Sequence, residues 1–208
     1  MTPDKVLKFW FKECSPEQWF KKKSAKFDAL IRRRFLKTYW AVVRGETGLG
    51  PRRKAGARRR EEGPRNSRAR EYAWETSDWR KTPRGRLAEI IVLDQFSRNM
   101  FRGKPQAFLY DPLALALAQE VVRRGDDRKL SKIERRFLYL PFEHSESKKM
   151  HREAVRVFKS LGDKEALWYE RDHKKVIDRF GRYPSRNKIL GRKSTVAEKK
   201  FLQTHKGW

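Results

Sequence analysis

The chain has 208 residues, of which 38% are hydrophobic and 12% aromatic, and this supply of core residues excludes wholesale disorder. The single cysteine, Cys14, excludes an internal disulfide and a cysteine cage for a metal, and no stretch approaches the ~20 apolar residues of a membrane span. The chain has 53 Lys and Arg but only 26 Asp and Glu, which gives a net charge of +27. This charge attracts polyanions such as RNA. The alternative is a solvated basic surface that has no dedicated partner. We expect a cytoplasmic protein without a signal peptide.

Helix start and stop signals recur along the chain. Thr2 and Thr82 precede a proline, and Ser131 and Thr195 precede a glutamate by three residues; both patterns are typical of a capped first turn. Apolar residues follow at helical spacing, and glycines mark the ends of several of these stretches. The predicted starts are Thr2, Ser15, Ser24, Thr82, Asp111, Ser131, Asp163 and Thr195, and the predicted ends include Gly125, Gly162 and Gly181.

The pattern predicts an all-α fold. No stretch alternates like a strand, and no Asn-Gly or Asp-Gly turn predicts a hairpin. About eight helices with short loops favour a stack of antiparallel helix pairs, similar to tetratricopeptide proteins, in a single domain over residues 1–208. Two local features are also expected: Asp111 as an N-cap, and Pro141 as the residue that interrupts the helix begun after Ser131.

One segment departs from this pattern. Residues 48–78 are rich in Gly, Pro and Arg and poor in aliphatic residues, which predicts a surface insertion within the domain. Its arginines form the nucleic-acid candidate, because arginine-rich peptides fold on RNA. A neutral insertion is the favoured interpretation, since long surface insertions cost little free energy. The candidates are Arg52, Arg53, Arg58, Arg59 and Arg60.

Several long motifs carry a family resemblance. They are LDQFSRNMFRG at 93–103, FLYLPFEHSE at 137–146 and RFGRYPSRNKILGRKST at 179–195, with VLKFWF at 6–11 near the N-terminus. These segments resemble a bacterial family catalogued as domain of unknown function 924. The resemblance implies a tetratricopeptide-like helical fold but brings no established activity. The segment at 48–78 and the strong basic charge depart from the family pattern.

The polar residues of these motifs are the site candidates. Asp94 and Arg98 are four residues apart on one predicted helix face and can pair. Glu143 and His144 follow Pro141, at the expected start of a new element. If these side chains converge, they form a pocket for a carboxylate or phosphate, with proton-transfer groups beside it. The alternative is that they only lock helix ends together. The predicted ligand-binding residues are Arg98, Asn99, Arg182, Arg186 and Asn187, and the catalytic candidates are Glu143, His144 and Asp94.

Three functions remain open from the sequence. The first choice is a non-enzymatic module that binds a peptide or a small anionic ligand. The second is an RNA-associated protein that relies on its charge. The third is a small hydrolase or transferase, with Glu143 or His144 as base and Asp94 as orienting carboxylate. No metal or cofactor is expected, because metal-site and nucleotide-binding motifs are missing. The four histidines considered as ligands are His144, His151, His173 and His205.

Overall fold

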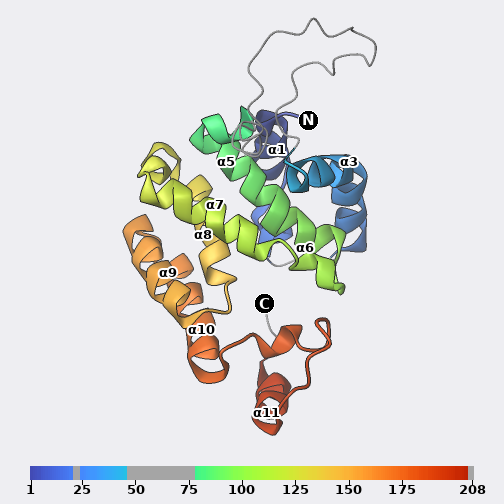
Figure 1. The fold of residues 1–208 in the computed structure, drawn as a ribbon, viewed down its shortest axis with the longest axis vertical. Coiled ribbons are helices and arrows are strands. Elements are labelled where there is room, and N and C mark those ends of the chain that lie inside the picture. Colours follow the sequence, from blue (N-terminus) through green and yellow to red (C-terminus); the bar gives the residue numbers. More distant parts are fainter. Residues whose placement is uncertain (21–23, 46–77, 206–208) are drawn as a thin grey trace, which may run out of the picture.

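The computed structural model describes residues 1–20, 24–45 and 78–205 (Figure 1). This part of the chain consists of helices and loops and contains no strand, which confirms the all-α prediction. The α-helices are α1 Pro3–Lys8, α2 Pro16–Phe20, α3 Ala25–Val43, α5 Pro83–Ile90, α6 Ser97–Met100, α7 Asp111–Arg123, α8 Lys132–Glu143, α9 Lys148–Leu161, α10 Lys164–Phe180 and α11 Val196–Thr204. Shorter 3₁₀ or π stretches are η1 Phe9–Glu13, η3 Asp78–Lys81, η4 Ile91–Phe96, η5 Pro105–Ala107, η6 Asp126–Lys129 and η7 Pro184–Arg186.

Local sequence determines most helix ends. Ser131 and Thr195 form capping boxes with Glu134 and Glu198, because each glutamate reaches back to the backbone of its cap. At the other end, Gly162 adopts φ 65° as the C-cap of α9, a left-handed conformation that favours glycine. These signals span four residues or fewer, and the structure confirms them.

Two local predictions were wrong. Pro141 lies inside α8, which continues to Glu143, so Glu143 and His144 end this helix and do not begin a new element. The proline is close to the end of the helix and costs one hydrogen bond, while the apolar face around it is buried. Asp111 makes no N-terminal cap for α7, because its carboxylate binds Arg98 instead.

An aromatic cluster forms the centre of the main core. The ring of Phe137 on α8 lies edge-on to Trp10 and Trp19, with centroid separations of 5.6 and 5.2 Å. Phe96 meets Trp10 in the same manner at 5.4 Å. Edge-to-face contacts of this kind add to the free energy of burial. The cluster therefore joins the N-terminal helices to η4 and α8.

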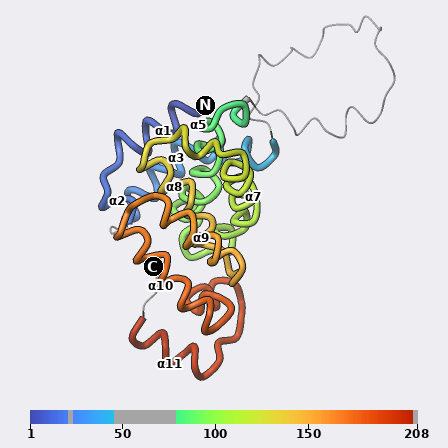
Figure 2. The backbone as a smooth tube through the Cα atoms, turned by 90° about the vertical axis from the view of Figure 1, so that its left-hand side faces the viewer, coloured from blue at the N-terminus to red at the C-terminus, as the bar shows by residue number. Residues whose placement is uncertain are grey.

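The C-terminal part is attached differently. α8, α9 and α10 pack in succession, and the two-residue loop 162–163 makes α9 and α10 antiparallel. Figure 2 shows α9 and α10 between the N-terminal helices above and α11 below. Val176 and Ile177 near the end of α10 form a small separate apolar cluster with Tyr183, which follows that helix. Polar contacts also join the segment after α10 to the rest, because Glu146 accepts hydrogen bonds from Arg192 and from the backbone N–H of Tyr183.

None of the described helices is long and apolar enough to cross a membrane. The predicted insertion at 48–78, with its five candidate arginines, lies outside the described residues except for Asp78.

Candidate functional site

Asp94 is the centre of a buried polar network. It lies in the π-helical stretch η4 and is fully buried. Its carboxylate is 2.8 Å from Nδ1 of His144 and 3.0 Å from Nη1 of Arg98, and it accepts a hydrogen bond from Gln95 at 2.5 Å. Burial alone would raise the pKa of Asp94, but the charge of Arg98 and the hydrogen bonds from His144 and Gln95 hold it well below its usual value. Asp94 is therefore ionised.

Arg98 is almost fully engaged by this network. Its Nη1 and Nη2 bind both carboxylate oxygens of Asp111, each at 2.8 Å, and Nη1 also donates to the Asp94 carbonyl at 2.7 Å. Burial opposes its charge, but Asp111 and Asp94 together raise the pKa of Arg98. The predicted pairing of Asp94 with Arg98 is present, and a second carboxylate strengthens it. Arg98 has few donors left for a ligand.

Arg186 is held in a different way. Its guanidinium lies between the rings of Phe108 and Tyr183, at 4.7 and 4.6 Å from their centroids. Its one hydrogen bond among the described residues is a long one, from Nη1 to Asp111 at 3.4 Å. Burial and the charge of Arg98 lower the pKa of Arg186. The side chain is 13% exposed, so this clamped cation keeps several free donors within reach of solvent.

His144 presents a free ring nitrogen. Because Asp94 is ionised, Nδ1 carries the proton and donates it to that carboxylate. Nε2 has no hydrogen-bond partner among the residues that the structure describes, and the side chain is 16% exposed. Burial and the charge of Arg98 lower the pKa of His144. His144 is therefore neutral at physiological pH, with an acceptor at Nε2.

A second polar network lies behind the first. Nδ1 of His151 is 2.9 Å from Glu170, and Nε2 of His151 is 2.9 Å from the carbonyl oxygen of Ser145. Burial raises the pKa of Glu170 to about 9 and lowers that of His151 to about 4, so both are neutral. Tyr183 donates from its hydroxyl to the carbonyl of Glu143. This second network fixes Tyr183, whose ring is one of the two that contact the guanidinium of Arg186.

Glu143 belongs to the buried side of the site. Burial raises the pKa of its carboxyl group well above the usual value. Nε2 of His173 lies 3.9 Å from this carboxyl. This shift favours the protonated form of Glu143, which cannot accept a proton in the role of base that the sequence suggested for Glu143 or His144.

The other predicted ligand residues bond to other partners. Asn99 donates to Asp28 on α3 at 2.8 Å. Arg182 binds Glu198 at 2.7 Å. Asn187 is fully buried and donates to Ser194 at 3.0 Å. The structure thus connects Asp94, Arg98 and His144 directly and Arg186 through Asp111, whereas the side chains of Asn99, Arg182 and Asn187 bond to residues outside this network.

Sequence reasoning missed several members of the site. Asp111 was expected to cap a helix, and Phe108 carried no signal of its own. His151 and Glu170 have a recognisable signature in retrospect, because each is a polar residue on the buried face of an amphipathic helix.

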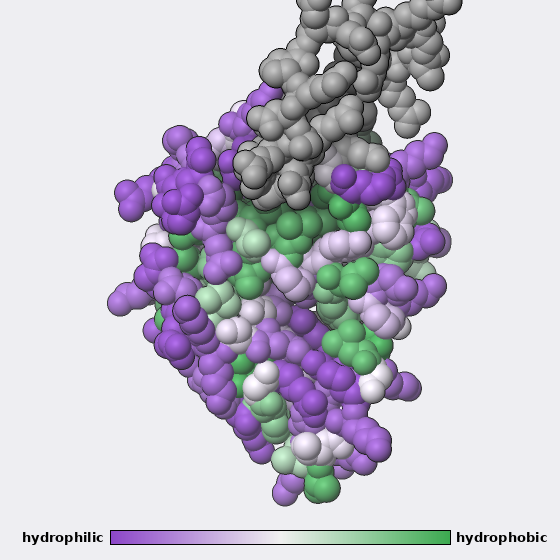
Figure 3. All heavy atoms as spheres, viewed as in Figure 1, coloured by the Kyte–Doolittle hydropathy of each residue, from purple (hydrophilic) through white to green (hydrophobic). Residues whose placement is uncertain are grey.

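Hydrophilic residues gather toward the lower middle of the face drawn in Figure 3. Within the described part of the chain, no three His, Cys, Asp or Glu side chains are grouped to hold a metal ion.

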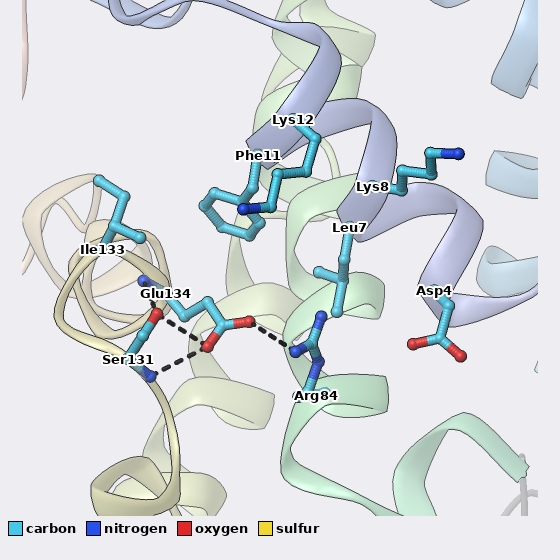
Figure 4. A pocket seen from close by; sticks show the side chains of 9 residues that line it. All are labelled: Asp4, Leu7, Lys8, Phe11, Lys12, Arg84, Ser131, Ile133 and Glu134. Carbon is cyan, nitrogen blue, oxygen red and sulfur yellow. Dashed lines mark hydrogen bonds and ion pairs between the residues drawn. The ribbon is translucent and has the colours of Figure 1, made fainter.

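A separate pocket of about 490 Å³ opens between α1, η1, α5 and the start of α8 (Figure 4). Glu134 accepts hydrogen bonds from Ser131 at its edge and lies 3.5 Å from Arg84. These charges already satisfy each other, and none of the predicted site residues lines this pocket.

Comparisons with known proteins extend the resemblance. A family model described as "Bacterial protein of unknown function (DUF924)" matches residues 6–206. A solved structure from Agrobacterium tumefaciens, described as protein of unknown function ATU0120, is 32% identical. The alignment covers 98% of this chain and 97% of that one, with a TM-score of 0.78. No curated protein matches the chain.

Proposed function

We propose that this chain, which belongs to the bacterial family of unknown function DUF924, binds the carboxylate or phosphate group of a small ligand or peptide at Arg186. The observation that carries the proposal is the guanidinium of Arg186 between two rings, which among the described residues has one long hydrogen bond and donors without a partner. Neither the family nor its relative brings an activity, so the proposal depends on these side chains.

The clamp reduces the cost of binding. Two aromatic rings contact the guanidinium, so little side-chain entropy is lost when an oxyanion binds. Asp111 already bonds both of its oxygens to Arg98, so it balances the charge of Arg186 only in part. A carboxylate or phosphate can accept two parallel N–H bonds from the guanidinium in this partly desolvated place. A bound anion would thus accept the hydrogen bonds that the Arg186 guanidinium does not donate to the described residues.

The test uses inorganic phosphate and acetate as probes. Calorimetric titration and thermal unfolding should show binding to the wild type at constant ionic strength, because a ligand of the folded state raises Tm. Arg186→Met should abolish this binding, and Arg186→Lys should weaken it strongly, because lysine keeps the charge but loses the planar fork.

The matched control is Arg179→Met, which removes an exposed arginine that lies over Phe180 in the same segment. It should leave binding unchanged, and circular dichroism should show that all three variants are folded. Equal binding by the wild type and Arg186→Met would assign any affinity to the general positive charge and refute the proposal.

A second candidate function is supported by the pair of Asp94 and His144. A carboxylate 2.8 Å from Nδ1 orients the imidazole and leaves Nε2 free to take a proton from a water or a hydroxyl. In this role Asp94 is the orienting carboxylate and His144 the general base of a small hydrolase or transferase acting on an anionic substrate. The protonated state of Glu143 favours His144 over Glu143 for this role.

A panel of nitrophenyl esters and nitrophenyl phosphate tests this candidate. Turnover by the wild type that falls by roughly a hundredfold or more in His144→Gln would support it, as expected for loss of a general base. Turnover that survives this substitution, or no turnover of any substrate in the panel, would remove the enzymatic candidate. Phosphate binding by His144→Gln would then show that the binding function stands without it.

A further inference from the structure

The exposed face of α10 carries a tryptophan in a row of cations. Lys164, Trp168, Arg171, Lys175 and Arg179 are three or four residues apart, so they follow one side of the helix, and all five are exposed. We call them the α10 stripe. At 1.5 Å per residue the stripe extends over roughly 22 Å. We infer that the α10 stripe binds single-stranded nucleic acid, with Trp168 as the surface on which a base stacks.

Trp168 is unusual among the tryptophans that the structure describes. It is 59% exposed, whereas Trp10 and Trp79 are buried and Trp40 is 39% exposed. The ring of Tyr169 meets it at 81° with centroids 5.0 Å apart, which supports the indole without covering it. A supported indole in water is suited to stacking, because every nucleobase offers a flat face.

The cations of the α10 stripe form few ion pairs with the other described residues. Lys164 and Arg171 form no ion pair within the described part of the chain, and Lys175 forms only a long one, with Asp172 at 4.0 Å. By contrast, Arg123 on α7 pairs with Glu120 at 2.9 Å. The charges of the stripe are therefore available to phosphates.

The neighbouring helix adds to this positive surface. α9 lies alongside α10 (Figure 2) and carries Lys149, Arg152 and Lys159 as further exposed cations. From Lys148 to Phe180 the chain has ten Lys and Arg against six Asp and Glu, and one of these acids, Glu170, is buried. A flexible polyanion can therefore find phosphate contacts on both helices.

The chemistry favours a single strand over the other partners of a basic surface. Bases in a duplex are already stacked and do not reach an indole that projects from a helix. A membrane surface would require a broad apolar face on the helix, and here one ring is surrounded by charges. A second copy of the chain would bring two positive faces together, which is unfavourable. This inference is independent of the Arg186 site.

The experiment measures fluorescence anisotropy of a labelled 20-nucleotide oligouridine with the full chain, across a salt series. Trp168→Ala should weaken binding roughly tenfold, because stacking contributes about that factor or more for each base. Arg171→Glu/Lys175→Glu should weaken binding and reduce the salt slope by roughly 0.7 for each cation removed. A duplex of the same length should bind more weakly and respond little to Trp168→Ala.

The matched control is Arg33→Glu/Lys37→Glu, which makes the same charge change at exposed positions four residues apart on α3. It should alter affinity less than twofold. Equal losses in both double variants, or an unchanged affinity in Trp168→Ala, would overturn the inference. So would a Trp168-dependent binding to anionic vesicles without RNA binding, or a Trp168-dependent dimer in sedimentation experiments.

Discussion

Replacing Glu170 by glutamine should make the protein less sensitive to rising pH. Burial raises the pKa of Glu170 from 4.5 to about 9, and Oε2 of this carboxyl has no hydrogen-bond partner among the described residues. The folded protein therefore keeps a proton that the unfolded chain releases above pH 4.5. Such a group contributes stability that is complete below the unfolded pKa and is lost as the pH rises toward the folded value.

The expected magnitude follows from these two values. Each pH unit in this window costs the wild type about 1.4 kcal/mol, whereas a glutamine stays neutral and still donates to His151. Between about pH 6.5 and pH 8.5, the free energy of unfolding of the wild type should therefore fall by about 3 kcal/mol relative to that of Glu170→Gln. The lowered pKa of His151 acts in the opposite direction, but between about pH 4 and 6.5, below this range.

Urea unfolding followed by tryptophan fluorescence at several pH values measures this difference. The control is Glu165→Gln, the same chemical change at an exposed position of α10, for which the difference from the wild type should stay nearly constant. If the difference in free energy of unfolding between Glu170→Gln and the wild type does not grow with pH, the buried pair of Glu170 and His151 holds no proton in this pH range. That result would refute the reasoning.

Three further substitutions test the packing, each by urea unfolding. Arg80→Met should cost about 3–5 kcal/mol, because it leaves the fully buried carboxylate of Glu89 without its bidentate partner. Gly85→Ala should cost about 1–3 kcal/mol, since the new methyl group would lie 1.9 Å from the carbonyl oxygen of Trp79. Phe137→Ala should cost about 3–5 kcal/mol by opening a cavity in the aromatic cluster.

Different probes distinguish the two functional proposals: phosphate tests the Arg186 site, and oligouridine tests the α10 stripe. Binding at Arg186 concerns a single anionic group and should depend on guanidinium geometry more than on charge. Binding by the α10 stripe concerns a strand of phosphates and should depend steeply on salt. Arg186→Met should therefore leave oligouridine affinity unchanged, and Trp168→Ala should leave phosphate binding unchanged.

The sequence by itself determined the helical class and most helix ends. Caps such as Ser131 with Glu134 and Thr195 with Glu198 act across three residues, and Gly162 needs only its own backbone freedom. The pairing of Asp94 with Arg98 was predictable for the same reason, because four residues on a helix bring the side chains together. Interactions of this range depend on little beyond the local chain.

Only the tertiary structure decided how the site is assembled. Asp111 was a reasonable cap until packing placed it against Arg98, and Arg186 reaches the same carboxylate from 75 residues away. His144 finds Asp94 across 50 residues, while Arg182 turns to Glu198. A charged side chain can pair with any of several residues. Which one it pairs with depends on the helices that the buried aromatic core brings together, and no local sequence pattern encodes that arrangement.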